Sequence, residues 1–312
     1  MLSRRSVRIK VMQLLYSLDR DSTLAAKDLI KSYENGVTQS YDLFLFSIYV
    51  LMKITENAVA DRDNRISKHL PSDYDKSFTD KIYSNVIIQD IIKNDTLQKK
   101  FEKLDFKSFI NQDYTKKIYD EFSKSDFYKT YINSSSSNED HTELLLELYR
   151  FCRQNELFNE ILEDSYFNWL DDKSLVVGAV KKYLKALPNT NKNFFRDFLP
   201  EDETVEEFGL SLLKNTIKNK DEIMELIIPV LDNWDHERLA IIDTILLRLA
   251  LCEFMDFPTI PTKVTLNEYV EMAKNYSTEK SKEFINGILD KLMKDLDAKG
   301  LLKKQGRGLV EE

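Results

Sequence analysis

The sequence predicts an all-α protein. Glycine and proline, the two residues that most disfavour helix interiors, occur only 7 and 6 times in 312 residues. Apolar residues recur at steps of three and four through most segments, which is typical of amphipathic helices. At this length the chain can bury a sizeable core, as one large domain or two ordinary ones.

Charge and hydropathy limit the function classes. The net charge of −8 argues against a general nucleic-acid binder, whose affinity comes largely from neutralising phosphates. Basic residues are nevertheless concentrated at both ends of the chain, in residues 4–10 and 299–307. No apolar run approaches the roughly 20 residues of a spanning helix without a charge, and the N-terminus lacks the apolar core of a signal peptide. We therefore expect a cytoplasmic protein with no membrane contact.

Residues 3–18 predict one amphipathic helix with Ser3 as its N-cap. Arg4, Arg5 and Arg8 fall off its apolar stripe, where they can face a phosphate backbone, and Gln13 lies near the exposed side. A solvated basic face on a core helix is the simpler interpretation, and the helix alone favours it. Arginines in the first turn oppose the helix dipole, however, which weighs against a purely structural role. The stripe consists of Val7, Val11, Leu14, Leu15 and Leu18.

The middle of the chain predicts further helices and little about function. We expect residues 24–68 to continue as helix. Residues 78–132 interleave aromatic residues with lysines, and we interpret them as helix faces and core rather than as a single-strand stacking surface. A polar loop, residues 134–141, precedes helices expected at 142–169 and 173–187.

Helix-start signals become clear after residue 200. Thr204 with Glu207 and Thr265 with Glu268 have the spacing of capping boxes. Gly287 lies inside the last predicted helix, where it costs about 1 kcal/mol relative to alanine. Such a glycine indicates close approach of a neighbouring backbone.

A helix that is apolar on most sides begins after Asp235, its expected N-cap, with Trp234 stapled onto it. A helix of this kind is expected at the centre of a bundle. Asp243 and Arg248 interrupt it. Either they are satisfied within the bundle, or they lie where the helix meets a partner.

Four stretches together carry a resemblance to the NusB family of transcription antitermination factors. The three C-terminal stretches are specific and extend over nearly a third of the chain, whereas the opening helix alone is weak. The stretches are RRSVRIKVMQLLYS, NWDHERLAIIDTILLRLALCEF, IPTKVTLNEYVEMAKNY and SKEFINGILDKL.

The resemblance implies binding of the boxA element of ribosomal RNA leaders, jointly with the ribosomal protein NusE. The complex then modifies the transcription elongation complex so that RNA polymerase reads through terminators. The resemblance also implies that the protein can form a homodimer, since some relatives form homodimers that hide the RNA surface. It assigns a NusE-facing position to Asp243 and RNA contacts to Arg4, Arg5, Arg8, Gln13, Thr259 and Lys263.

The chain departs from the family in size, because members are usually about half as long. A NusB-like helical bundle enlarged by an inserted helical region is therefore expected. We assign residues 1–20 to the N-terminal helix, 21–200 to the insertion, 201–297 to the C-terminal half and 298–312 to a disordered basic tail.

Enzymatic function is not expected. A NusB-like domain also precedes certain RNA cytosine methyltransferases, but this chain has no G-x-G-x-x-G turn, and neither Cys152 nor Cys252 follows a proline. His69, His141 and His236 share no metal-ligand spacing. We expect no cofactor and no metal. The remaining alternative is a protein-only helical adaptor in the transcription complex, without direct RNA binding.

Overall fold

The computed structural model describes residues 1–21, 23–231 and 239–306, and every regular element in these ranges is helical. The chain divides into two compact units. The middle unit comprises residues 38–199 with Met1, and the terminal unit comprises residues 2–37 and 200–312. Helix α2 (Ala26–Ile66) contributes residues to both.

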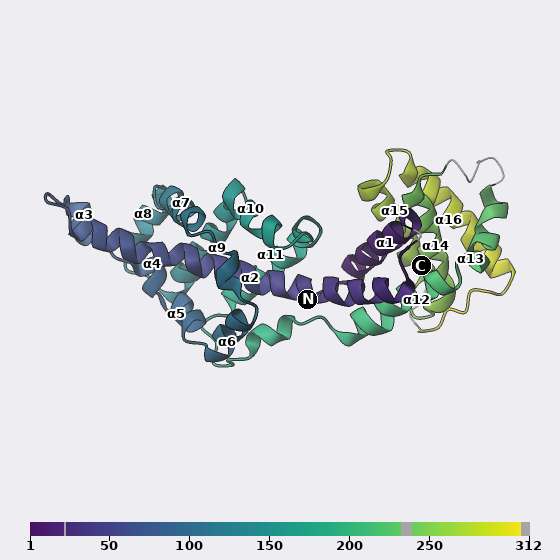
Figure 1. The fold of residues 1–312 in the computed structure, drawn as a ribbon, viewed down its shortest axis with the longest axis horizontal. Helices are drawn as coiled ribbons and strands as arrows, with labels where there is room; N and C mark the ends of the chain where they lie inside the picture. The colour runs from purple at the N-terminus through teal and green to yellow at the C-terminus, as the bar shows by residue number, and fades with distance from the viewer. Residues whose placement is uncertain (22, 232–238, 307–312) are drawn as a thin grey trace. The chain divides into compact units, whose positions relative to one another are not determined.

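In the terminal unit, α14 is the central helix, as the sequence predicts. It packs against α1, α12, α13, α15 and α16 (Figure 1). Its predicted cap Asp235 and staple Trp234 lie outside the described residues. Besides the start of α2, the elements of this unit are α1 (Arg4–Arg20), η3 (Glu203–Leu210), α12 (Ser211–Lys218), α13 (Lys220–Ile227), η4 (Ile228–Leu231), α14 (Ile241–Asp256), α15 (Thr262–Tyr276) and α16 (Ser281–Ala298).

The predicted capping box at residue 204 is wrong. The helical segment η3, which is a π-helix, already begins at Glu203, so Thr204 lies inside it. The box at residue 265 is wrong for a similar reason. Helix α15 begins at Thr262 with Pro261 as its N-cap, so Thr265 lies inside the helix and is buried there.

The close backbone approach inferred for Gly287 is also wrong, because no atom of a neighbouring element lies within 4 Å of the position its Cβ would take. Close approach occurs instead at Gly209 in η3. A Cβ there would overlap the hydroxyl of Tyr33 and a methyl group of Val7. The glycine therefore lets η3 lie directly against α1 and the start of α2.

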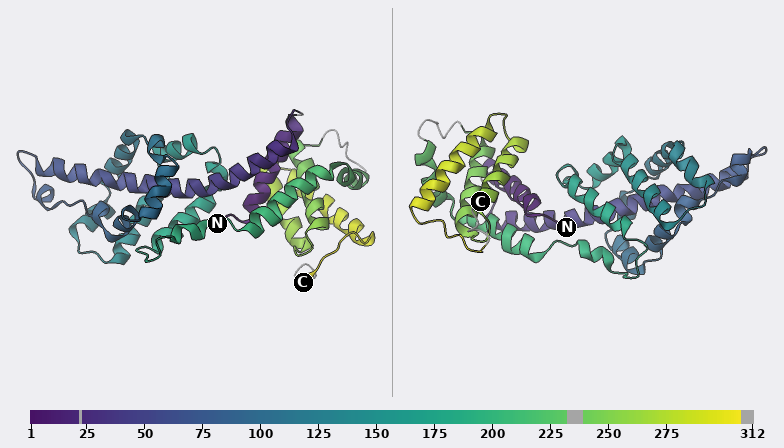
Figure 2. Two further views of the ribbon diagram at one scale, coloured as in Figure 1. Left: turned by 60° about the horizontal axis from the view of Figure 1, so that its bottom comes forward. Right: turned by 180° about the vertical axis from the view of Figure 1, so that it is seen from behind.

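The middle unit surrounds the apolar part of α2 with shorter helices (Figure 2). The region predicted as two helices at 142–187 contains three, because one helix ends at Cys152 and the next ends at Ser165. The elements are α3 (Asp73–Ser77), α4 (Lys81–Ser84), α5 (Val86–Ile92), α6 (Asp95–Lys103), η1 (Phe106–Phe109), α7 (Gln112–Phe122), α8 (Asp126–Asn133), α9 (Asn138–Cys152), α10 (Glu156–Ser165), α11 (Trp169–Lys185) and η2 (Phe194–Phe198).

Helix α2 carries the core of the middle unit. By length and apolar composition it could cross a membrane, contrary to the expectation from sequence, but 72% of its most apolar window is buried within the protein. Such burial is typical of a core helix. Most aromatic residues of 78–132 also pack inside, including Phe101, Phe106, Tyr119 and Phe122, which confirms their interpretation as core. The free thiols of Cys152 and Cys252 are buried.

Candidate nucleic-acid interface

Helix α1 positions the predicted basic residues. The Ser3 side chain accepts a hydrogen bond from the Ser6 backbone N–H, which confirms the predicted N-cap. Val7, Val11 and Leu15 are fully buried, as the periodicity predicts. Leu14 and Leu18 are only half-buried, because Arg8, Lys10 and Met12 also lie on the buried side of the helix.

The predicted exposure of Arg8 is wrong. Its side chain is 3% exposed, and its guanidinium binds both carboxylate oxygens of Glu253 on α14. Burial disfavours the charged guanidinium, but the hydrogen bonds and charge of Glu253 outweigh this and raise the pKa of Arg8. Arg8 is therefore charged and enclosed, and it cannot contact a phosphate backbone in this arrangement.

Glu253 is the centre of a buried polar cluster that links three helices. Besides Arg8 of α1, it accepts hydrogen bonds from the hydroxyls of Thr265 (2.7 Å) and Tyr269 (3.0 Å) on α15. Its side chain is fully buried. Burial and the charge of Glu253 raise the pKa of Tyr269 well above its ordinary value, so the phenol remains protonated and donates. The cluster ties α1, α14 and α15 together.

Arg4 and Arg5 remain accessible at the start of α1, with side-chain exposures of 38% and 53%. Arg4 pairs with Glu203 at 2.8 Å. Arg5 binds Glu268 through two hydrogen bonds of 2.8 Å, and this arrangement lies beside the buried cluster, because Arg8 also approaches Glu268 at 3.5 Å. Both exposed arginines thus already have an acidic partner within the terminal unit.

The electrostatics of Glu268 follow from its neighbours. Partial burial would raise the pKa of this carboxyl, but the hydrogen bonds from Arg5 and the charges of Arg8 and Arg5 outweigh it and lower the pKa. Hydrogen bonding to Glu268 in turn raises the pKa of Arg5. The pair is fully ionised at neutral pH, and it directs the Arg5 side chain along the α1–α15 side of the bundle.

The second predicted region lies at the start of α15. Thr259 and Lys263 are both exposed, as a contact with RNA requires. Lys263 precedes Glu268, the partner of Arg5, by about one and a half turns on α15. Gln13 is half-buried on α1, two turns beyond Arg5. Lys263 thus shares helix α15 with the partner of Arg5, and no hydrogen bond described for Lys263 or Thr259 links either residue to the arginines.

The C-terminal segment is anchored against this region, contrary to the expected disorder of residues 298–306. The Lys304 ammonium donates hydrogen bonds to the carbonyl oxygens of Glu253 (3.3 Å) and Phe257 (3.0 Å), at the C-terminus of α14. The backbone N–H of Gln305 donates to the Pro258 carbonyl. Burial lowers the pKa of Lys304 to about 8. Residues 307–312 lie outside the described residues.

The prediction that Asp243 faces a partner is wrong. Its carboxylate is 5% exposed and accepts a hydrogen bond from the Ser281 hydroxyl at 2.8 Å. The reason is the position of α14, whose sides are covered by the other helices of the terminal unit. Arg248 is likewise buried and pairs with Asp19 at 2.6 Å. Both residues thus have a partner within the bundle, but Oδ1 of Asp243 and Nε and Nη2 of Arg248 are buried without a hydrogen-bond partner among the described residues.

Within the described ranges, no group of three or more His, Cys, Asp or Glu side chains is arranged to hold a metal ion. The charged residues of the site form ion pairs between helices instead, such as Arg5 with Glu268 and Arg8 with Glu253. Such a surface offers guanidinium and ammonium groups to an anionic partner.

Comparison with known proteins gives the family. The NusB family model matches residues 171–294, a stretch that begins in α11 of the middle unit and ends in α16. Transcription antitermination protein NusB of Salinibacter ruber is 42% identical over 112 residues, which cover 36% of this chain and 70% of that protein. No solved structure matches.

Two further relatives carry the same name. NusB of Chloroherpeton thalassium is 40% identical over 37% of this chain and 57% of its own length. NusB of Koribacter versatilis is 37% identical over 36% of this chain and 78% of its own length. The likeness therefore covers most of two relatives but only about a third of this chain, which belongs to the NusB family of transcription antitermination proteins, a family without enzymatic activity.

Proposed function

We propose that the protein acts in antitermination by binding boxA-type RNA of ribosomal RNA leaders, together with the ribosomal protein NusE, in the cytoplasm. The observation that carries this proposal is the accessible pair Arg4 and Arg5 at the start of α1, in a chain that belongs to an antitermination family. Arginines at a surface can bind phosphates with two parallel hydrogen bonds. Gln13, Thr259 and Lys263 are proposed to extend this contact.

Arg8 has a different part in the proposal. Its buried pair with Glu253 sets the rotation of α1 about its axis and so keeps Arg4 and Arg5 on the outside. Asp243 is not proposed as a contact to NusE, since it is enclosed by the bundle. Residues 38–170, which precede the stretch that matches the family model, are proposed to be a helical addition to the family's fold.

A protein-only adaptor is the second candidate. It is favoured by the acidic partners of the arginines, because Glu203 and Glu268 neutralise the two side chains that RNA would bind. The two functions differ in salt dependence, since only phosphate contacts release counterions. An adaptor would bind NusE and show no selectivity for boxA.

The test is RNA binding by the purified full-length protein, with and without its cognate NusE. A boxA-containing leader RNA is compared with a scrambled sequence at two salt concentrations. Selective binding that tightens when NusE is present supports the proposal. If NusE binds while the two RNAs are indistinguishable, the adaptor is the correct function.

A further inference from the structure

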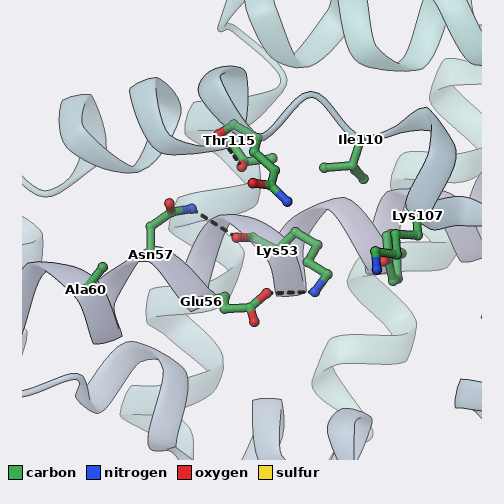
Figure 3. A pocket seen from close by; sticks show the side chains of 9 residues that line it. Lys53, Glu56, Asn57, Ala60, Lys107, Ile110 and Thr115 are labelled. Atoms are coloured by element: carbon green, nitrogen blue, oxygen red, sulfur yellow. Dashed lines mark hydrogen bonds and ion pairs between the residues drawn. The ribbon is translucent and has the colours of Figure 1, made fainter.

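The middle unit contains a pocket that antitermination does not explain. It measures about 310 Å³ and lies between α2 and the segment from η1 to the first turn of α7 (Figure 3). Helix α2 contributes Tyr49, Lys53, Glu56 and Asn57, and Lys107 stands on the opposite segment. Small-molecule sites start at about 300 Å³, so the pocket has room for a ligand of metabolite size.

One end of the pocket presents hydrogen-bond donors. Figure 3 shows the Lys53 amino group paired with Glu56 on α2, and Lys107 on the segment that lines the pocket opposite. Among the described residues, the Lys107 side chain has no ion-pair partner, whereas Lys53 pairs with Glu56 at 2.7 Å. Tyr49 is 7% exposed, and its hydroxyl has no hydrogen-bond partner in the part of the chain that the structure describes. Burial raises the pKa of Tyr49, so the hydroxyl is protonated at neutral pH.

The other end presents acceptors. The Asn57 side-chain N–H group donates to the backbone carbonyls of Lys53 (3.0 Å) and Ile54 (3.2 Å), which leaves its oxygen as the free acceptor. Glu56 lies between the two ends, because one of its carboxylate oxygens pairs with the Lys53 amino group at 2.7 Å. The second oxygen is available to a ligand. A ligand that matches both ends carries an anionic group and, a few bonds away, hydroxyl donors.

We propose that this pocket binds a small phosphorylated ligand of the sugar phosphate or nucleoside monophosphate class. The phosphate lies at Lys53, Lys107 and the Tyr49 hydroxyl, and the ligand hydroxyls donate to Glu56 and Asn57. The lining contains two lysines and one glutamate, so its formal charge is positive in a chain whose net charge is −8. The negative charge of the phosphate would balance the positive charge of the lining through charge-assisted hydrogen bonds.

The test uses isothermal titration of the full-length protein with ribose 5-phosphate. Inorganic phosphate and ribose serve as the two half-ligands. We expect saturable binding of ribose 5-phosphate, weaker binding of phosphate and no binding of ribose. The double variant Lys53→Gln with Lys107→Gln should lose affinity by at least about tenfold, while its thermal midpoint shows that it folds.

The matched control is Lys99→Gln with Lys103→Gln, which makes the same charge change on exposed residues of α6 outside the pocket. It should bind ribose 5-phosphate as the unaltered protein does. The proposal is overturned if ribose 5-phosphate fails to bind at about 10 mM, or if the control loses as much affinity as the pocket variant. Equal affinity for phosphate and ribose 5-phosphate would contradict the proposed hydrogen bonds from the ligand hydroxyls to Glu56 and Asn57.

A final arm separates a free ligand from a nucleic-acid backbone. A single-stranded RNA without terminal phosphates is titrated into the unaltered protein and into the lysine double variant. If the double variant loses RNA affinity while ribose 5-phosphate does not bind, the pocket contacts a polymer and the small-ligand proposal is wrong. Unchanged RNA affinity in the double variant, with loss of ribose 5-phosphate binding, supports it.

Discussion

Arg8 and Glu253 form a buried, doubly hydrogen-bonded ion pair that joins α1 to α14. The Arg8 Nε donates to Oε2 of Glu253 at 2.8 Å, and Nη2 donates to Oε1 at 2.6 Å. Neither side chain is more than 3% exposed. Because the pair holds α1 in one rotation about its axis, the outward orientation of Arg4 and Arg5 depends on the buried Arg8.

Replacing Arg8 should therefore destabilise the terminal unit. Arg8→Met leaves the Glu253 carboxylate buried without its partner, which costs about 3–5 kcal/mol. Arg5→Met, which breaks an ion pair whose arginine is half exposed, should cost at most about 1 kcal/mol. Urea denaturation of both variants measures the difference. Equal losses would contradict the structural role of Arg8.

The Arg5–Glu268 pair should make stability depend on pH. The pKa of Glu268 is lowered from its ordinary 4.5, so the pair stabilises the folded state above that pH and loses its contribution as the pH falls. The free energy of unfolding of the protein minus that of Glu268→Gln should therefore shrink between about pH 6 and pH 3. Chemical denaturation at several pH values measures it. A difference that does not change with pH would contradict a lowered pKa of Glu268 in the folded protein.

Gly209 should be the least replaceable glycine of the terminal unit. The Cβ of Gly209→Ala would overlap Tyr33 and Val7, and overpacking of this kind costs about 1–3 kcal/mol. Gly287→Ala is the matched control, because that helical position is open and alanine should stabilise it by about 0.5–1 kcal/mol. Thermal unfolding distinguishes them. Stabilisation by both substitutions would contradict the close packing of η3.

Removing the acidic partners should strengthen RNA binding under the proposed function. Phosphates must compete with Glu203 and Glu268 for Arg4 and Arg5, so Glu203→Gln with Glu268→Gln should raise the affinity for boxA RNA. Glu279→Gln with Glu283→Gln changes the net charge equally at exposed positions near the start of α16. Fluorescence anisotropy measures both. The same gain in each variant would indicate only a general charge effect.

Local pattern explains why the fold was predictable and parts of the site were not. The steps between Val7, Val11 and Leu15 place these residues on one helix face whatever surrounds it. The burial of Arg8 depends instead on Glu253, which is distant in the chain and meets it only in the folded unit. No local periodicity contains that information.

One signal for the buried cluster was present. Glu253 is an acid within LALCEF, in a helix that is apolar on most sides. A buried carboxylate needs a partner, so Glu253 predicts a buried cation or hydroxyl nearby. Asp243 in the same helix follows the same rule in part, since one of its carboxylate oxygens accepts a hydrogen bond from Ser281. By contrast, the close packing at Gly209 depends on Tyr33, and its sequence neighbours contain no sign of it.

The central claim is that Arg4 and Arg5 bind RNA phosphates, and the most direct test is the salt dependence of boxA binding. Arg4→Gln with Arg5→Gln is compared with Lys274→Gln and Lys294→Gln, which remove two exposed charges from α15 and α16. We expect the arginine variant to bind more weakly and to flatten the slope of log affinity against log salt by about 1.4, with the lysine variant unchanged. An unaltered slope in the arginine variant would contradict the claim.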